Sequence, residues 1–487
     1  MTRRHATRRI FGPFNRVEGD LEVQVTVRDG RVTEARVNAP LFRGFETMLQ
    51  GRDPRDALVY MPRVCGICSV AQSAAAAAAL ADAMGIEPTP NGRLAADLIL
   101  ACENLADHLT HFYLFFMPDF AREAYRSRPW FDEVRSRFRA GEGQALATVL
   151  PARAEWMHLT GILAGKWPHT LSIQPGGSTR PVTAAEKVRL QRIVARFRRF
   201  LETVLFTDRL ERVAALETAT ALERWAETHG DSDFARFLRV SADLGLAGFG
   251  RAYDRFLSVG AYPQNSSRAL FAAGVYVDGQ VHPLDPAGIT EDVSHAWMAV
   301  SQTPRHPFDG VTVPDVERPE AYSWCKAPRW RGMAMETGAL ARQMVDGHPL
   351  IRDLVRRDGG NVHSRVVARL LEFARVLPAM ESWLAALNPA EPFCRPAAPL
   401  DEGEGVGLVE AARGSLGHWL RVRDGRVSNY QIIAPTTWNF SPRDGRGVPG
   451  PLEAALEGLE IGERGEHELR IHHVVRSFDP CMVCTVH

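Results

Sequence analysis

The chain has 487 residues, 45% of them hydrophobic, and its 58 basic residues balance its 58 acidic residues. A formal charge of zero argues against a nucleic-acid or anionic-membrane partner, because binding to either depends on surplus Lys and Arg. No run of about 18 apolar residues is present, so we expect no transmembrane helix. The basic start leads into Ile10-Phe11-Gly12-Pro13 and not into an apolar segment, which argues against a secretory signal.

The seven cysteines are an odd number in a long chain. This usage favours a reducing compartment and metal-binding or catalytic thiols over a disulfide scaffold. We therefore expect a cytoplasmic protein that does not insert into a membrane.

Both ends of the chain have the alternation that is typical of β-strands. Residues 21–27 alternate between apolar and polar side chains, Asp29-Gly30 predicts a turn, and residues 31–37 return as a second strand. The same pattern predicts a second hairpin over residues 420–433, with its turn at Asp424-Gly425.

The middle of the chain is compatible with long helices, because apolar residues recur there at helical spacing. Helices are predicted at residues 69–84, 94–117, 143–165, 184–226 and 362–387. Pro and Gly cluster in predicted loops at residues 262–267, 302–321 and 389–400.

We therefore predict an α+β fold, mainly helical, with a large helical core and small β elements from both terminal regions. No low-complexity linker divides the chain, so we expect one domain over residues 1–487. Its parts are an N-terminal β region (1–64), a helical core (65–400), and a C-terminal β region with a metal-binding tail (401–487).

Two C-x-x-C pairs, Cys65 with Cys68 and Cys481 with Cys484, lie near opposite ends of the chain. Such a pair can direct two thiolates at one ion, so the two pairs offer four soft ligands. On cysteine count alone a structural zinc is the favoured interpretation, and a redox-active disulfide is a weaker competitor.

Three features change that balance. Zinc knuckles are local, whereas these pairs are separated by nearly the whole chain. Each pair also has unusual neighbours, with Gly66 inside the first and Asp479-Pro480 before the second. Finally, the sequence ends three residues after Cys484, at His487.

The segments Arg63-Val-Cys-Gly-Ile-Cys68 and Asp479-Pro-Cys-Met-Val-Cys-Thr-Val-His487 resemble the two signature motifs of nickel-iron hydrogenase large subunits. Further segments resemble the family in order along the chain: Arg16–Gly19, Arg43–Glu46, Gly51–Pro54, Asp107-His108, His111–Tyr113, Tyr322–Arg329, Ala412–Gly414 and Gln431–Asn439. Each match is weak alone, but their order makes the resemblance specific.

The resemblance implies a nickel ion held by all four thiolates. Cys68 and Cys484 would also bridge to an iron, while Cys65 and Cys481 would bind nickel alone. The iron would carry one CO and two cyanides, with no other ligand from the protein. Thiolates are soft, electron-rich donors that suit nickel.

The resemblance also implies how H₂ would be split, with a metal taking hydride and a base taking the proton. Our choice of base is Cys481, and Glu18 would relay the proton outward. Arg413 would sit above the metals and offer its donors to the cyanides, oriented by Asp107 and Asp479. By position alone, Glu18 and Asp107 would be surface carboxylates.

Two smaller groups of residues follow from the same resemblance. Thr436 would donate a hydrogen bond to a cyanide beside the close-packing Pro435. A magnesium ion would be held by His487, Glu46 and the backbone carbonyl of Ile432, since magnesium prefers oxygen ligands and keeps several waters.

The electrons must leave through another chain. Cys102, Cys325 and Cys394 lack the spacing of an iron-sulfur site, which generally needs four ligands, and we expect them to be buried core thiols. The family's iron-sulfur small subunit is the expected partner, in an obligate heterodimer or a dimer of heterodimers with an apolar interface.

Gln72 stands where most catalytic members have histidine, four residues after the second cysteine. This residue and the C-terminal motif resemble the cytoplasmic, hydrogen-sensing regulatory hydrogenases. Ile67 and Phe115 match the gas-channel constriction, where many catalytic members have Val and Leu, although ordinary core variation would also explain them.

We therefore expect a hydrogen sensor that oxidises H₂ slowly and reports to a histidine kinase through its small subunit. The sequence carries no C-terminal extension, as expected for a sensor, although a processed enzyme would end in the same way. A cytoplasmic uptake hydrogenase that feeds respiration is the alternative. A non-catalytic subunit like that of respiratory complex I is less favoured, because the four cysteines are intact.

Overall fold

In the computed structural model, the described residues are all of the chain except 1–5, 266–267, 463–465 and 486. Most of the basic start, the end of the predicted loop 262–267 and Val486 of the C-terminal motif therefore lie outside the described residues. Helices and strands are both abundant, and the predicted α+β class is confirmed.

The N-terminal region forms a three-stranded antiparallel sheet of β1 (Thr7–Phe11), β2 (Glu22–Arg28) and β3 (Arg31–Asn38). The predicted hairpin is confirmed as β2 and β3, which turn at Asp29-Gly30. The edge strand β1 was not predicted, because its five residues, Thr-Arg-Arg-Ile-Phe, do not alternate between apolar and polar; charged side chains are common in edge strands.

The C-terminal region forms a second antiparallel sheet of β11 (Gly403–Ala411), β12 (Gly414–Arg423) and β13 (Arg426–Ile433). Its predicted hairpin corresponds to β12 and β13. Pairing of Ala411 with Gly414 leaves Ala412 and Arg413 as the two-residue turn from β11 to β12.

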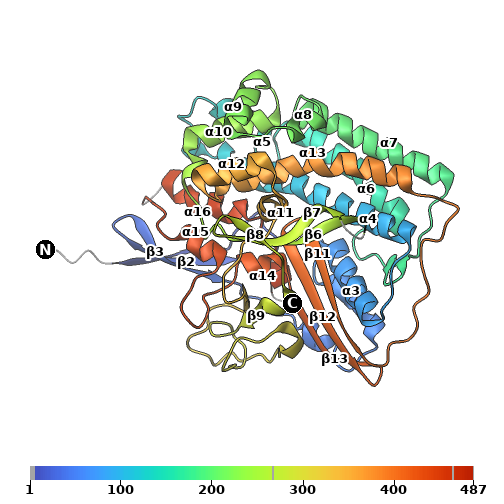
Figure 1. Cartoon of the computed structure of the whole chain (residues 1–487). Coiled ribbons are helices and arrows are strands. Elements are labelled where there is room, and N and C mark those ends of the chain that lie inside the picture. Colours follow the sequence, from blue (N-terminus) through green and yellow to red (C-terminus); the bar gives the residue numbers. More distant parts are fainter. Residues whose placement is uncertain (1–5, 266–267, 463–465, 486) are drawn as a thin grey trace.

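Helix α3 (Ser69–Ala83) lies directly on this C-terminal sheet (Figure 1). A Cβ atom on Gly405 would come within 2.1 Å of the Ala79 carbonyl oxygen, and one on Gly407 within 2.0 Å of that of Ala75. The glycines of β11 and the alanines of α3 therefore allow the two backbones to meet without a layer of side chains between them.

The other long helices are close to their predicted places: α4 (Pro90–Thr110), α6 (Leu146–Ala164) and α13 (Val362–Ala386). After α4 the chain continues as a π-helical turn over His111–Phe116. The prediction of a single helix over 184–226 is wrong. The chain there breaks into α7 (Ala184–Phe200), α8 (Leu210–Ala214) and α9 (Ala219–Thr228), and Thr207 has a positive φ between α7 and α8.

The helical core also contains strands that were not predicted, namely β4 (Ile173–Gln174), β5 (Gly177–Ser178), β6 (Phe256–Asn265), β7 (Arg268–Val277), β8 (Gln280–His282), β9 (Ile289–Asp292) and β10 (Ala327–Trp330). The predicted loop 262–267 is wrong over Tyr262–Asn265, which belong to β6 and pair with β7. Pro263 is accommodated because the register shifts beside it. The predicted loops 302–321 and 389–400 contain only one short 3₁₀ turn, at Pro307–Asp309.

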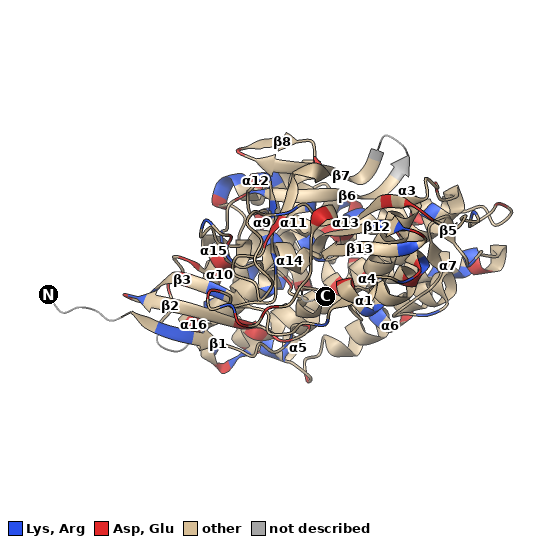
Figure 2. Cartoon of the chain, turned by 90° about the horizontal axis from the view of Figure 1, so that it is seen from below, with Lys and Arg blue, Asp and Glu red and all other residues tan. Residues whose placement is uncertain are grey.

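The remaining helices are shorter and fill the space between these layers: α1 (Phe45–Met48), α2 (Ala57–Tyr60), α5 (Phe131–Phe138), α10 (Asp233–Leu244), α11 (Ala339–Asp346), α12 (Pro349–Asp358), α14 (Pro435–Asn439), α15 (Pro451–Leu456), α16 (Glu466–Ser477) and α17 (Met482–Thr485). Among the described residues, none of the helices has the length and hydrophobicity to span a bilayer. Figure 2 shows basic and acidic residues mixed over the elements in view, in keeping with the balanced charge.

The two ends of the chain meet inside the molecule. A parallel bridge joins Glu18 to Cys481, and the Met482 N–H donates to the Glu18 carbonyl oxygen at 2.7 Å. The C-terminus lies near the centre of the molecule in Figure 1, and His487 Nε2 is 3.4 Å from Glu46 of α1.

Gly407→Ala should destabilise the protein, because its Cβ would clash with the backbone of α3. Overpacking of this kind costs about 1–3 kcal/mol in the free energy of unfolding, measured as a denaturant midpoint. Gly161→Ala, on an exposed face of α6 with nothing within 4 Å of the added Cβ, is the control and should stabilise by up to about 1 kcal/mol. Equal midpoints for the two variants would contradict the close contact of α3 with β11.

Candidate metal centre

The sulfur atoms of Cys65, Cys68, Cys481 and Cys484 all lie within 4.8 Å of one another, and all four residues are buried. The Sγ–Sγ distances are 3.4 Å for Cys65 and Cys481, and 3.1 Å for both Cys68–Cys484 and Cys481–Cys484. The two pairs therefore face one another around one point, as four ligands of a single centre require.

The first pair is positioned by the start of α3. Cys68 is the residue that precedes the helix, and its N–H donates to Cys65 Sγ at 3.3 Å. The free N–H groups and the dipole at a helix N-terminus stabilise negative charge on nearby sulfur. Glu103 of α4 accepts the next N–H groups, from Val70 at 2.9 Å and Ala71 at 3.0 Å, and so fixes the helix end.

The second pair is positioned by two backbone contacts. The Cys481 N–H donates to Thr436 Oγ1 at 3.1 Å, and the Cys484 N–H donates to the Cys481 carbonyl at 3.1 Å. Asp479, with φ of 58°, turns the chain from α16 toward the centre. The second C-x-x-C segment is thereby curled so that both sulfurs reach the same side.

Arg43 joins the two segments directly. Its guanidinium donates to the carbonyl oxygen of Val64, next to the first pair, and to that of Val483, inside the second pair. This role was missed from the sequence, although Arg43 belongs to one of the segments that resemble the family.

The thiols influence one another's ionisation. Burial opposes the charge of Cys481, but hydrogen bonds from its three sulfur neighbours hold its pKa well below the usual value. Hydrogen bonds within the same group, together with burial, raise the pKa of Cys68. Burial, and then hydrogen bonds with Cys481 and Cys65, raise the pKa of Cys484 against the opposing effect of Cys68. Four adjacent thiolates repel one another, and a soft cation is what would let all four ionise.

Arg413 lies at the hairpin turn beside the thiols, where its charge interacts with Cys481 and Cys68. Its guanidinium donates to Asp107 Oδ2 and, at 3.2 Å, to Asp479 Oδ1. The structure thus brings together three residues that the sequence assigned to one group, and all three are buried.

The charges of this group are unequal, since one guanidinium faces two carboxylates. Burial raises the pKa of Asp107 to about 7, against the opposing effect of Arg413. Burial also disfavours the charge of Asp479, but Arg413 and then His111 lower its pKa. Asp479 therefore provides the permanent negative charge, while Asp107 can exchange a proton near neutral pH.

Glu18 is half-buried at the edge of the thiol group. Burial raises its pKa, the charge of Cys65 raises it further, and Arg413 and Arg43 oppose the shift. A carboxyl group with a raised pKa is suited to transfer protons near neutral pH.

Thr436 is the second residue of α14, directly after Pro435, and both are buried. Its hydroxyl oxygen accepts the Cys481 N–H, so its own proton remains available to a further acceptor.

Near the C-terminus, Glu46 is the hub of a buried polar group. His487 Nε2 lies 3.4 Å from Glu46 Oε1, while His487 Nδ1 bonds the Cys484 carbonyl at 2.7 Å. Ile432 contributes its N–H, which donates to Glu46 Oε1 at 2.8 Å.

Lys326, which was not predicted as a site residue, contacts Glu46 at 3.0 Å. Burial opposes the positive charge of Lys326, but the carboxylates of Glu291 and Glu46 raise its pKa.

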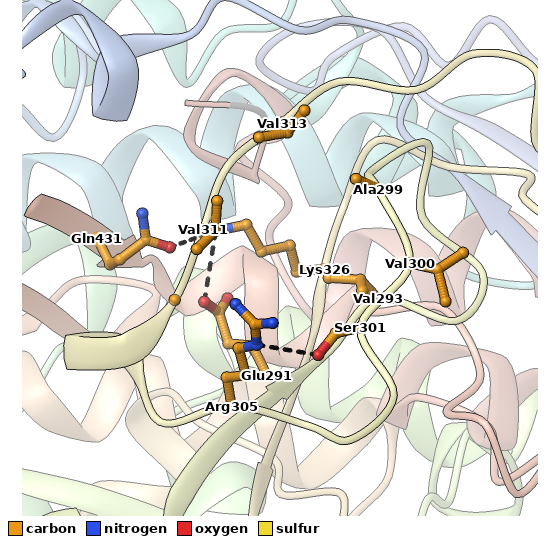
Figure 3. A pocket seen from close by; sticks show the side chains of 11 residues that line it. Glu291, Val293, Ala299, Val300, Ser301, Arg305, Val311, Val313, Lys326 and Gln431 are labelled. Carbon is orange, nitrogen blue, oxygen red and sulfur yellow. Dashed lines mark hydrogen bonds and ion pairs between the residues drawn. The ribbon is translucent and has the colours of Figure 1, made fainter.

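A cavity of about 140 Å³ leads to this group from the surface. Figure 3 shows Lys326 pointing between Gln431 and Glu291, at 2.8 Å and 3.4 Å. The exposed side chains of Val300, Val311 and Val313 lie along the outer part of the cavity. Ser301 and the exposed Arg305 line the cavity beside these valines, and Lys326 connects it to Glu46.

Ile67, Phe115 and Gln72, which the sequence analysis singled out, lie in three different elements. Ile67 is half-buried in the turn between Cys65 and Cys68, and Phe115 is half-buried in the π-helical turn after α4. Gln72 is buried in the first turn of α3 and bonds His418 at 2.8 Å.

The remaining cysteines are scattered. Cys102 and Cys325 are buried as predicted, whereas Cys394 is partly exposed. The prediction that Cys394 is a core thiol is therefore wrong, because it lies in the irregular loop 389–400 at the surface. Among the described residues, only the four-thiol group places three or more His, Cys, Asp or Glu ligands within reach of one ion.

A mainly helical α+β chain with a buried tetrathiol centre and an adjacent guanidinium has the ligand set of a metalloprotein that binds a soft cation. Residues 43–122 and 146–487 match the family described as "Nickel-dependent hydrogenase". The chain therefore belongs to the nickel-dependent hydrogenases, as the large subunit of an enzyme of this family.

Relatives and solved structures of the same kind match the chain over nearly its full length. The periplasmic [NiFeSe] hydrogenase large subunit of Desulfomicrobium baculatum is 31% identical over 98% of this chain and 94% of its own. The uptake hydrogenase large subunit of Rhodobacter capsulatus is 28% identical over 98% and 94%. The Ni-Fe-Se hydrogenase structure from D. vulgaris Hildenborough superimposes with a TM-score of 0.85 at 30% identity, covering 99% of this chain and 100% of that one.

Arg413→Leu should strongly destabilise the subunit, because it leaves Asp107 and Asp479 buried without their cation. Breaking a buried pair in this way costs about 3–5 kcal/mol, measurable from the denaturant midpoint of the purified complex. The control is Arg31→Leu, whose side chain is 58% exposed and pairs with Glu460 at the surface. That change should cost at most about 1 kcal/mol. Similar losses in both variants would contradict the assignment of Arg413 as a buried anchor.

Proposed function

We propose that this subunit splits H₂ heterolytically at a nickel-iron centre bound by Cys65, Cys68, Cys481 and Cys484. The observation that carries the proposal is the meeting of four buried sulfurs within 4.8 Å, with Arg413 beside them. The bound metals, with CO and two cyanides on iron, would supply the hydride acceptor. By resemblance to the family motifs, Cys68 and Cys484 would also hold the iron.

The chain's own residues would handle the proton. Cys481 would accept it first, and Glu18 would carry it outward. Glu18 suits this step because it bridges to Cys481 through the backbone, is half-buried, and has a raised pKa. Arg413 and Thr436 would donate to the anionic cyanides, and Pro435 would pack beside them.

A magnesium ion near the C-terminus is a second proposed cofactor. Glu46 offers the carboxylate oxygen that magnesium prefers, and His487 and the backbone carbonyl of Ile432 would complete the group with waters. Because His487 also bonds the Cys484 carbonyl, an ion here would fix the second cysteine pair.

An iron-sulfur small subunit is the proposed electron acceptor, since Cys102, Cys325 and Cys394 are too scattered to hold a cluster. The heterodimer could pair further into a dimer of heterodimers. We place it in the cytoplasm, where the small subunit would report to a histidine kinase.

Hydrogen sensing is the proposed physiological role, supported by Gln72, Ile67 and Phe115. The larger side chains of Ile67 and Phe115 would narrow a gas channel so that H₂ passes and O₂ is hindered. Oxidative uptake is the second candidate, because full-length relatives of this chain include uptake hydrogenases. Slow H₂ oxidation by the purified heterodimer would support sensing, whereas fast oxidation coupled to quinone reduction would establish uptake.

The metal centre can be tested on the purified heterodimer by a nickel assay combined with infrared spectroscopy. We expect one nickel per large subunit and the stretching bands of bound CO and cyanide. Cys481→Ser and Cys65→Ser should lose nickel, while Cys394→Ser should keep it. Zinc in place of nickel, without infrared bands, would overturn the proposal.

Replacing Ile67 and Phe115 with Val and Leu should make H₂ oxidation sensitive to oxygen, because a wider channel admits the larger gas. The measurement is the H₂ oxidation rate after exposure to air, relative to the anaerobic rate. Val70→Ala, a similar shortening of a buried side chain in α3, is the control and should leave oxygen tolerance unchanged. Full activity of the double variant in air would refute the narrow channel.

A further inference from the structure

A second cavity lies between the C-terminal half of α3, the start of α4 and strand β4. Its volume is about 360 Å³, within the range of roughly 300–1,000 Å³ that is typical of small-molecule sites. Four alanines of α3 (Ala74, Ala77, Ala78 and Ala81) form one wall. The cavity exists because these positions of α3 carry only methyl groups.

Asp97 of α4 lines the same cavity, although only 9% of its surface is exposed. Among the described residues, its side chain has no hydrogen-bond or ion-pair partner, and only burial and the charge of Arg93 affect its ionisation. A buried carboxyl group without a partner costs free energy and is uncommon in folded proteins. The fold therefore leaves a buried acceptor that a ligand in the cavity can satisfy.

The charges around the cavity favour a cationic ligand. Within the described part of its wall, Arg93 is the only basic residue, and its guanidinium bonds Glu87 at 2.9 Å and not Asp97. Asp82 of α3 accepts the Val406 N–H at 2.8 Å, and β4 contributes no charged side chain. Three carboxyl groups thus face one guanidinium that is already paired.

The ligand geometry does not suit a metal ion. Magnesium and calcium take several oxygen ligands. Over the described residues, only the four thiols bring three or more ligand groups within reach of one ion. An ammonium group can instead pair with a single carboxylate, while an attached hydrocarbon chain is removed from water against apolar side chains.

We propose that this cavity binds a small aliphatic primary amine. The ammonium group bonds the Asp97 carboxylate, and the hydrocarbon chain packs against Ala74, Ala78 and Ala81. The site lies at the opposite end of α3 from Cys68, the residue that precedes the helix. It is therefore separate from the metal centre, and the inference goes beyond the function proposed above.

Binding should release a proton. Burial raises the pKa of Asp97 to about 8, against the opposing charge of Arg93, so the carboxyl group is mostly protonated in the empty cavity at neutral pH. When the ammonium ion binds, the carboxyl group ionises and its proton passes to the solvent. Affinity should therefore rise with pH, by roughly tenfold from pH 6 to pH 7, and level off above the pKa.

The test uses the purified heterodimer and n-butylammonium as the probe, titrated by calorimetry at several pH values in buffers of different ionisation enthalpy. We expect one site per large subunit, proton release at pH 7, and weaker binding of n-butanol, which has the same chain without the charge. Asp97→Asn, which keeps the shape but cannot ionise, should abolish the proton release and weaken binding at pH 8 by about tenfold or more.

Two further variants separate the site from general effects. Ala78→Leu fills the cavity while Asp97 remains, and it should also weaken binding. Asp132→Asn removes an exposed carboxyl group on α5 and, as the matched control, should bind like the native protein. No binding of n-butylammonium to the native heterodimer, or equal binding by Asp97→Asn, would overturn the proposal. The titration does not depend on H₂ oxidation, so absence of nickel would refute the proposed function and leave this test unchanged.

Discussion

The structure depends on holding together two thiol pairs that are 416 residues apart in sequence. Chain entropy opposes such long-range closure, and four adjacent sulfurs cannot all ionise without a cation. Three connections offset these costs: the backbone bridge between Glu18 and Cys481, the Arg43 guanidinium across both segments, and the contact of His487 with Glu46. None of them uses the sulfurs, so the frame that positions the ligands is separate from the ligands.

Two buried groups of ion pairs lie beside these connections and determine the charge around the thiols. Arg413 forms ion pairs with Asp479 and with Asp107, and Lys326 forms ion pairs with Glu46 and Glu291. Both cations are buried, and each lies where carboxylates outnumber it. Removing such charges from water costs free energy unless they are fully paired. Their presence here is therefore better explained by a role in the metal centre than by stability alone.

Much of the centre could be predicted from the sequence because its ligands occur in short, specific patterns. The spacing of each cysteine pair, and the resemblance of Arg413, Asp107 and Asp479 to family motifs, were sufficient to place these residues in one group. Arg43 and Lys326 were missed as site residues, because a lone basic residue has no local pattern that distinguishes a buried contact from a surface charge.

In the fold, too, features encoded by local sequence were predicted and features that depend on distant contacts were not. Hairpins with Asp-Gly turns and uninterrupted helices were predictable from local sequence. The strands β6 to β10 were not, because their pairing depends on partners supplied by the tertiary structure, as with Pro263 in β6. The contact of α3 with β11 was not predicted either. Glycine lowers the β-propensity of a strand, although here it permits the close approach of the helix backbone.

The position of the last ten residues has a consequence for the order of assembly. Their contacts are with the Glu18 segment, α14, Arg43 and Glu46, all of which belong to parts of the chain synthesised earlier. The first pair is positioned by α3 and α4, whereas the second pair is positioned only through these contacts, so the four-thiol group can form only after the segments that the tail contacts have folded. Docking of this segment therefore completes the set of four sulfurs and buries all of them at once.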